Sequence, residues 1–394
     1  MDYSQLYSWQ FTPTTIGLLV ITAIAAIALI SMILPSLNLI IRKNEEETDT
    51  DLSSLSHGLS VIVASGFHTD KLRSFIENIY SQDISLPVEI IIVNTGGEEH
   101  TEDTIRILQS EYPEIKNTFV PTNSRNLSKR KLAITLGIKA ASHPVVLLTS
   151  ANAIPQGRGW LSSTMNRFAN GADIVIGTTV IKNTQTDAGI GKIRAFDTVK
   201  SLLRKIPEAI KGKPIGADSS NLAYRKSLFF NNKGFSETLN LNYGDDDIFI
   251  SEIAKKHNVA VNLSPDSVIT LHEENPTKIY DLERISRTFT QSKLRRLPFL
   301  LSDFHDFIWW IWLIATVSAI ITGLPSLMPA LISIVIATIL IISLSLKWKK
   351  VTDAMSLPSH APLIPLFYLI NPYISMKYKL NIGRKTRNYT WQNL

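Results

Sequence analysis

The sequence predicts an α/β domain with membrane-spanning helices on both sides of it. Largely apolar runs of strand length stand at residues 59–64, 88–93 and 145–149, and residues 172–177 add another predicted strand. Segments with helical spacing of apolar residues lie between them, at residues 72–80 and 127–141. Apolar runs of this length are typical of parallel strands buried on both faces, and their alternation with helices indicates an α/β sheet. Ligands are expected beyond the carboxyl ends of such strands.

The composition narrows the classes of protein to consider. The 394 residues include no cysteine, which excludes disulfides and thiolate metal sites and fits a reducing compartment. The net charge is +6, with Lys and Arg concentrated around the apolar segments and in short clusters, so membrane phosphates and an anionic substrate are both candidate partners. Nucleic acid is not predicted as a partner, because there is no long basic tract, zinc-finger spacing or aromatic RNA-binding signature.

Three apolar segments are predicted to span a membrane. Residues 14–41 hold no charged side chain and are long enough for a helix to cross a bilayer. A signal peptide would begin with basic residues, but none precedes Arg42. Residues 307–322 and 327–346 read as a helical hairpin joined by a short link. The later stretch at residues 361–374 contains three prolines, and we interpret it as an interfacial or re-entrant piece.

Basic residues next to these spans predict their orientation. The clusters comprise Arg42, Lys43, Arg295, Arg296, Lys347, Lys349 and Lys350. Since basic flanks stay in the cytoplasm, we expect a multi-pass protein of the inner (cytoplasmic) membrane with its soluble domain in the cytoplasm. The expected organisation is an anchor at 1–42, a linker at 43–57, the α/β domain at 58–303, a transmembrane hairpin at 304–350, and an amphipathic or re-entrant segment with a basic tail at 351–394.

A basic amphipathic helix is predicted at residues 190–210. Its apolar side includes Ile193, Phe196 and Leu203, while basic residues cover much of the rest. Such a helix can lie on the cytoplasmic leaflet of a membrane, or it can be a surface helix with a solvated face.

Gly244-Asp245-Asp246-Asp247 is the clearest candidate for chemistry. Three adjacent carboxylates repel one another, and a helix N-terminus partly offsets their charge, so a capping turn is one interpretation. The other is catalytic: a carboxylate there could act as a general base on an acceptor hydroxyl.

Basic and metal-binding candidates lie elsewhere in the chain. Ser128-Lys129-Arg130-Lys131 begins a predicted helix, where positive charge opposes the helix dipole unless an anion such as a diphosphate is near; solvated side chains are the alternative. Arg295-Arg296 could form a lipid-facing collar or stabilise a leaving diphosphate. His272-Glu273-Glu274 could supply metal ligands or form an ordinary loop.

The order and spacing of several motifs resemble one enzyme family. The segments are LSVIVA and VEIIIV, then SKRKLAITLGIKAA, VVLLTSANAIPQGRGWL, SSNLAYRKSLFF, GDDDIFI and SKLRR. From about residue 58 to residue 300 the chain resembles the membrane-bound bacterial family 2 glycosyltransferases. The resemblance implies a GT-A nucleotide-sugar-binding fold with a mixed, mostly parallel sheet, and it assigns the general base to Asp246, with Asp245 and Asp247 beside it.

The chain departs from the family pattern on the donor side. Asn94-Thr95 replaces the donor-binding aspartates, and Ser150-Ala151-Asn152 replaces the Asp-x-Asp motif that holds Mg²⁺ or Mn²⁺. Of the Gln-x-x-Arg-Trp motif only Arg295 remains. Losing both carboxylates removes the hard oxygen ligands that such a metal prefers, unless it binds through substitutes such as Asp218, Asp245 or His272.

Two functional hypotheses follow from the resemblance. The first is a transferase that moves a sugar from a nucleotide-sugar donor to a lipid-linked or cell-envelope polysaccharide acceptor. Its donor-binding residues would be Asn94, Thr95, Lys129, Arg130, Lys131, Ser150, Asn152 and Arg295, the cations neutralising the diphosphate in place of a metal. The second is an inactive scaffold with the same fold that binds a partner enzyme or glycan at the membrane. Transport is disfavoured, because the predicted spans contain no charged residue.

Overall fold

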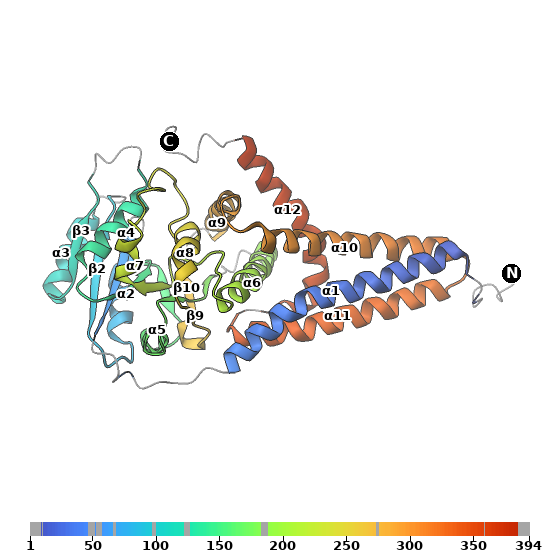
Figure 1. The fold of residues 1–394 in the computed structure, drawn as a ribbon, viewed down its shortest axis with the longest axis horizontal. Coiled ribbons are helices and arrows are strands. Elements are labelled where there is room, and N and C mark those ends of the chain that lie inside the picture. The colour runs from blue at the N-terminus through green and yellow to red at the C-terminus, as the bar shows by residue number, and fades with distance from the viewer. Residues whose placement is uncertain are drawn as a thin grey trace. The chain divides into compact units, whose positions relative to one another are not determined.

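The computed structural model describes residues 9, 11–45, 52, 57–65, 68–96, 100–121, 127–182, 188–272, 276–357 and 359–384 (Figure 1). The chain divides into two compact units. The helical unit contains Met1–Arg42, Lys192–Arg204 and Arg296–Lys377, and the sheet unit contains Lys43–Gly191, Lys205–Arg295 and Tyr378–Leu394. Most of the predicted linker at 43–57, and the tail after residue 384, lie outside the described residues.

The sheet unit is built on a mixed, mostly parallel sheet. Within the described residues it has seven strands, in the order β3-β2-β1-β4-β8-β6-β9. Their bounds are β1 Leu59–Ser65, β2 Val88–Asn94, β3 Lys116–Phe119, β4 Val145–Thr149, β6 Ile174–Ile176, β8 Leu222–Arg225 and β9 Val259–Val261. Ile62 of β1 is in register with Ile91 and Leu148 on either side, and β8 runs antiparallel to β4 and β6. The predicted fold class is confirmed.

A second, smaller sheet lies in the same unit. It consists of β5 (Ala153–Pro155), β10 (Ile269–Leu271) and β7 (Thr179–Ile181), in the order β5-β10-β7. Leu271 is in register with Ala153 of the antiparallel β5 and with Ile181 of the parallel β7. The residues just before β5 and just after β7 and β10 therefore lie at one end of this sheet.

Amphipathic helices bury their apolar faces against the main sheet. The helices of the sheet unit include α2 Leu72–Tyr80, α3 Thr101–Glu111, α4 Lys129–Ala140, α5 Trp160–Ala169, α7 Lys226–Asn231, α8 Asp247–Ile253 and α9 Pro276–Gln291. Leu72, Phe75 and Ile79 of α2 are buried in a core that includes Trp160. Gly137 lets α4 approach β1 closely, since a Cβ there would lie 2.4 Å from Cγ2 of Ile62.

Glu89 of β2 is a buried carboxylate held by several donors. It pairs with Lys116 at 2.7 Å and accepts hydrogen bonds from the Ser60 hydroxyl and the Ser142 backbone amide. Burial alone would raise its pKa, but these partners lower the pKa of Glu89 to about 2. The ion pair and hydrogen bonds of Glu89 therefore stabilise the folded state at every pH at which the carboxyl group is also charged in the unfolded chain.

We expect Glu89→Gln to lower the free energy of unfolding by about 2 to 3 kcal/mol at pH 7, because each unit of pKa difference corresponds to about 1.4 kcal/mol. Since the pKa is depressed in the folded state, this contribution is present above the ordinary glutamate pKa and is lost as the pH falls toward 2. Denaturant titrations of both proteins between pH 3 and pH 7 should converge at the acid end. Glu111→Gln, at the exposed pair with Arg73, is the control and should change little. Equal differences at both pH values would contradict the prediction.

The helical unit contains the long apolar helices. They are α1 Pro13–Glu45, α10 Arg296–Gly323, α11 Met328–Ala354 and α12 Ile364–Arg384, the last beginning after a short 3₁₀ turn. Among the described residues, three helices are long and apolar enough to cross a membrane, at Pro13–Lys43, Arg296–Gly323 and Met328–Ala354. Figure 1 shows α10 running alongside α1 and α11, and Thr15 of α1 donates a hydrogen bond to Thr322 of α10 at 3.2 Å.

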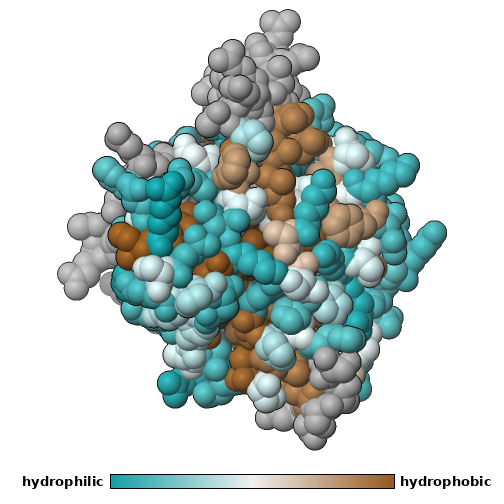
Figure 2. All heavy atoms as spheres, turned by 90° about the vertical axis from the view of Figure 1, so that its left-hand side faces the viewer, coloured by the Kyte–Doolittle hydropathy of each residue, from teal (hydrophilic) through white to brown (hydrophobic). Residues whose placement is uncertain are grey.

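The two units differ in what their surfaces expose. Exposed large apolar side chains of the helical unit include Ile24 and Ile27 of α1, Ile314 and Ile321 of α10, and Ile334 and Ile339 of α11. Figure 2 shows a face of the molecule on which hydrophilic residues cover most of the surface, with apolar side chains scattered between them. Continuous apolar exposure on long helices is typical of contact with lipid, whereas scattered apolar residues on a polar face are ordinary in water.

The second span begins earlier than the sequence pattern indicated. The predicted start was residue 307, but α10 begins at Arg296, so that it includes His305 and Asp306. Asp306 is buried and pairs with Lys200, and it accepts a hydrogen bond from the Asn371 side chain at 2.9 Å. The statement that the spans lack charge therefore holds for residues 307–322 and not for the whole helix. The partners of Asp306 explain why a carboxylate is tolerated in an apolar helix.

The predicted basic helix at residues 190–210 is α6 (Ala188–Ile210), and its charges are not simply on the surface. Arg194 and Lys200 are buried in the structure. Phe196 stacks on Trp348 of α11 with ring centroids 5.4 Å apart. Both interpretations of this helix from the sequence predict exposed cations, so neither accounts for the burial of Arg194 and Lys200. These two residues are buried because they pack inside the helical unit.

Candidate active site

The three aspartates lie at the start of α8 as the sequence predicts. Gly244 has a φ of +93°, a left-handed conformation that glycine adopts without strain, and it turns the chain into the helix. Asp246 is the N-cap, and its Oδ1 accepts a hydrogen bond from the Asp247 amide at 2.7 Å. The capping interpretation and the catalytic one are thus compatible, because the cap uses one carboxylate oxygen.

Two of the three carboxylates are buried and paired with cations. Asp245 pairs with the Arg130 guanidinium at 2.8 Å. Asp247 pairs with the Lys205 ammonium at 2.9 Å and accepts a hydrogen bond from the Thr290 hydroxyl at 2.9 Å. Burial alone would raise the pKa of Asp245, but the charge and hydrogen bond of Arg130 lower it.

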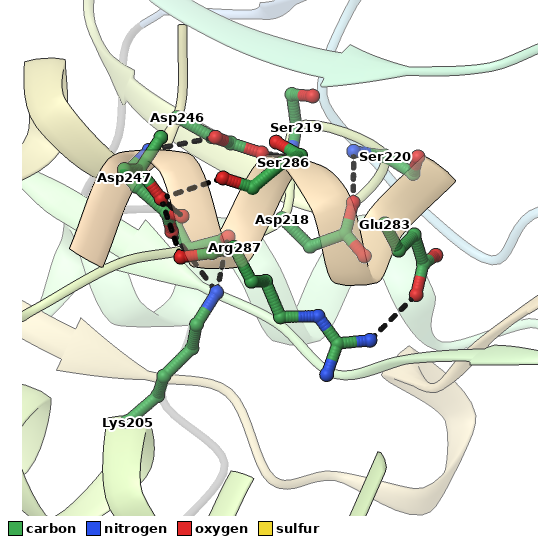
Figure 3. A network of polar contacts seen from close by, with 11 residues as sticks. Lys205, Asp218, Ser219, Ser220, Asp246, Asp247, Glu283, Ser286 and Arg287 are labelled. Atoms are coloured by element: carbon green, nitrogen blue, oxygen red, sulfur yellow. Dashed lines mark hydrogen bonds and ion pairs between the residues drawn. The ribbon is translucent and has the colours of Figure 1, made fainter. Parts of the chain in front are cut away.

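Asp246 differs from Asp245 and Asp247 in its surroundings, and Figure 3 shows the Lys205 side chain reaching Asp247. It is partly exposed, and among the described residues no cation forms an ion pair with it. Its Oδ2 accepts a long hydrogen bond of 3.3 Å from the Ser219 amide. Burial and the charges of Asp247 and Asp245 raise the pKa of Asp246 well above that of an ordinary aspartate. The raised pKa favours uptake of a proton by Asp246.

Helix α9 contributes residues that the sequence pattern did not single out. Glu283 pairs with Arg287 at 2.8 Å, and Thr290 reaches Asp247. Burial raises the pKa of Glu283, although Arg287 opposes the effect. Figure 3 shows the Glu283 and Arg287 side chains near Asp218, whose Oδ1 accepts a hydrogen bond from the Ser220 amide at 2.9 Å. The spacing of residues 283, 287 and 290 places them on one helix face, a signal that could have been found in the sequence.

The predicted diphosphate-binding cations have different surroundings. Lys131 is fully buried, and its ammonium donates to the carbonyls of Thr238 and Tyr243 at 2.7 and 3.0 Å. Burial lowers the pKa of Lys131 to about 8. Arg130 lies beside Asp245, Lys129 is exposed, and Arg295 pairs with Glu208 at 2.5 Å. Arg130 thus reaches the aspartates, whereas Arg295 contacts Glu208 and the Lys213 carbonyl.

The predicted donor-side residues lie at the carboxyl ends of the parallel strands. Asn94 ends β2, and its side chain accepts a hydrogen bond from the Gly96 amide at 2.8 Å, next to Thr95. Ser150 and Asn152 follow β4, with their side chains hydrogen-bonded at 2.6 Å. The Asn152 carbonyl accepts a hydrogen bond from the His272 amide at 3.0 Å. The structure therefore brings these residues to the edge where an α/β sheet binds ligands.

The residues at the metal-motif position do not fit a divalent metal. Ser150 and Asn152 offer a hydroxyl and an amide instead of carboxylates, and hard cations of this kind are held mainly by anionic oxygens. Within the described residues there is no group of three His, Asp or Glu side chains with the spacing of a metal site. Glu273 and Glu274, proposed with His272 as ligands, lie outside the described residues.

Comparison with known proteins shows which family and which solved structures this chain is similar to. Residues 60–230 match the family described as Glycosyl transferase family 2. The mannosyltransferase PcManGT from Pyrobaculum calidifontis, solved with GDP-Man and Mn²⁺, is similar in structure with a TM-score of 0.54 at 18% identity, over 90% of this chain and 99% of that one. GalNAc-T7, solved with UDP, GalNAc and Mn²⁺, has a TM-score of 0.41 at 11% identity, over 55% of this chain and 44% of that one. No curated protein matches the sequence.

The matched segment and the structural likeness to PcManGT define a fold of the GT-A type. The segment at residues 60–230 matches the family 2 glycosyltransferases, the family that the sequence resembles.

Proposed function

We propose that this protein transfers a sugar from a nucleotide-sugar donor to an acceptor hydroxyl, with Asp246 as general base. As the acceptor oxygen bonds to the anomeric carbon, its proton passes to Asp246, the bond from that carbon to the diphosphate breaks, and a nucleoside diphosphate leaves. The observation that carries the proposal is the state of the three carboxylates: Asp245 and Asp247 are neutralised by cations, whereas Asp246 is partly exposed and unpaired among the described residues.

The flanking pairs have a supporting role in this mechanism. Arg130 and Lys205 anchor the carboxylates on either side of Asp246, so that the loop before α8 is fixed at both positions. The neighbouring negative charges at the same time raise the pKa of Asp246, which makes it a stronger base than an exposed aspartate. Positioning and basicity thus come from the same cluster.

The pH dependence of the reaction should follow from the raised pKa. A general base works in its deprotonated form, so we expect kcat/KM to rise with pH through the pKa of Asp246 in the free enzyme. Because that pKa is raised, the rising limb should lie above pH 4, where an ordinary aspartate titrates. Steady-state kinetics between pH 4 and pH 9 measure it. A rate already constant from pH 4 upward would contradict the assignment.

The acceptor is proposed from the rest of the chain. Three helices long and apolar enough to cross a membrane favour an acceptor that is itself held at the membrane, namely a lipid-linked or cell-envelope polysaccharide. The basic residues next to the spans favour an inner-membrane protein with the sheet unit in the cytoplasm, where nucleotide sugars are available.

A panel of nucleotide sugars tests the function. Purified full-length protein in detergent is offered GDP- and UDP-linked sugars, with lipid extract as acceptor, and release of the nucleoside diphosphate is measured. We expect one donor to be consumed in an acceptor-dependent way. If folded protein consumes and binds no donor, the second candidate, an inactive scaffold that binds a partner enzyme or a glycan, takes its place; the altered donor-side residues Asn94, Ser150 and Asn152 are what favours it.

Metal binding through substitute residues is the less favoured way of holding the donor. Mg²⁺ or Mn²⁺ would need Asp218, Asp245 or His272, but Asp245 already pairs with Arg130. Burial and the charges of Lys182 and Lys71 lower the pKa of His272, and the same charges oppose a second cation there.

A further inference from the structure

One end of the small sheet gathers residues from three distant segments. Leu271 of β10 is in register with Ala153 of β5 and Ile181 of β7. The next residues along the chain, Asn152 before β5, Lys182 after β7 and His272 after β10, therefore share that end. Two backbone hydrogen bonds fix the arrangement, from the His272 amide to the Asn152 carbonyl at 3.0 Å and from the Lys182 amide to the Leu271 carbonyl at 2.9 Å.

Lys71 reaches the same place from the main sheet. It ends the short 3₁₀ turn Thr69–Lys71 after β1, and its ammonium donates to the His272 carbonyl at 2.7 Å. The charges of both Lys71 and Lys182 act on the His272 imidazole, whose pKa is lowered by burial first and then by Lys182 and Lys71. The Lys71 ammonium and residue Lys182 thus both lie close to His272, at the end of the small sheet where Asn152 precedes β5.

These two lysines lack anionic partners among the described residues. Neither Lys71 nor Lys182 forms an ion pair there, in contrast to Arg130, Lys205 and Arg295, which all do. Among the residues that the structure describes, two cations without an ion pair lie beside a neutral Ser-Ala-Asn segment and give this end of the small sheet a positive charge. Such a charge attracts a diphosphate and repels a divalent metal.

We propose that Lys71, Lys182 and the imidazole of His272 bind the donor's diphosphate directly, at the position where a metal would otherwise hold it. The proposal rests on the proposed transferase function and names the residues of its donor site. Each lysine donates charge-assisted hydrogen bonds to phosphate oxygens, and an N–H of His272 donates a third. The lysines also stabilise the negative charge that grows on the leaving diphosphate. This arrangement explains why the metal-motif position has no carboxylates. Neutral residues stand where the family has carboxylates, and the two lysines supply the positive charge that the metal ion would supply.

This assignment differs from the one that the sequence alone favoured. Arg130 and Arg295 were candidates for the diphosphate, but they are neutralised by Asp245 and Glu208. Lys131 is fully buried and donates to two backbone carbonyls. Within the described part of the chain, the cations near the metal-motif position that form no ion pair are Lys71 and Lys182.

Calorimetric titration of the full chain in detergent tests the proposal. The probes are UDP and GDP, with uridine and guanosine as comparisons without phosphate, all in EDTA. We expect one of the diphosphates to bind in EDTA, and Lys71→Met and Lys182→Met each to weaken that binding about tenfold or more, as loss of one charge-assisted hydrogen bond does. Any binding of the matching nucleoside should be unchanged. Lys182 is exposed, so its variant should fold normally.

Lys256→Met is the matched control. Lys256 is exposed and lies just before the start of β9. Strands β4, β6 and β9 run in the same direction, so Lys256 lies at the end of the main sheet opposite to the carboxyl end of β4. It should bind the diphosphate like the unmodified protein. Binding that requires added Mn²⁺ or Mg²⁺, or full affinity in both lysine variants, would overturn the diphosphate site and leave the transferase function standing. Failure of the unmodified protein to bind either diphosphate under all conditions would overturn both.

Discussion

Replacing Asp246 by asparagine is expected to reduce kcat by about 10²- to 10⁴-fold, the usual contribution of general base catalysis. The amide keeps the size of the side chain and can still accept the hydrogen bond from the Asp247 amide that caps α8. It cannot accept a proton from the acceptor hydroxyl. The donor should therefore bind nearly as before, so that its KM changes little while kcat falls.

Variants of two other aspartates distinguish a role of Asp246 as general base from a structural role. Asp83→Asn, at an exposed position with no resolved role in the site, should leave kcat unchanged. Asp245→Asn removes the partner of Arg130 and should disturb stability as well as rate. Full turnover by Asp246→Asn would remove the proposed mechanism, though not the family assignment. A loss of rate that disappears when the protein is stabilised by lower temperature would point to a structural role only.

The long strands of the main sheet were predictable because their signal is local. β1, β2 and β4 consist largely of apolar residues, as is typical of buried parallel strands. The small sheet was not predicted, since β5, β7 and β10 have three residues each and too few positions to show a pattern. The start of α10 was placed too late because charged residues were taken as the edge of the span. Asp306 lies inside the helix since Lys200 and Asn371, far away in sequence, neutralise and hydrogen-bond it.

In the candidate site, too, some features are visible in the local sequence and others depend on contacts between distant residues. Three consecutive aspartates before a helix are visible in the sequence, but nothing local tells which of them is free. That depends on Arg130, Lys205 and Thr290, which come from three different helices. Lys71 and Lys182 are single lysines with no motif around them. Strand register and one side-chain hydrogen bond bring them together, and both arise only on folding.

Lys205→Met is expected to lower the free energy of unfolding by about 3 kcal/mol, because it leaves the Asp247 carboxylate buried without its cation. Both groups are largely buried, with 16% of the Lys205 side chain and 5% of the Asp247 side chain exposed. The Lys205 ammonium also donates to the Ala217 carbonyl at 3.1 Å, and that bond is lost as well. Denaturant titration of the full chain in detergent measures the difference.

Two further variants show whether the effect belongs to the pair. Adding Asp247→Asn to Lys205→Met removes the stranded charge and should restore part of the lost stability, since a neutral amide is cheaper to bury than a lone carboxylate. Lys211→Met, at an exposed end of its pair with Glu208, should change little. Because the Lys205 charge lowers the pKa of Asp246, Lys205→Met should also move the rising limb of the pH profile to higher pH. A stable Lys205→Met protein with an unshifted profile would mean that the Asp247 carboxylate is already neutral or solvated, and the cluster would then not tune its base.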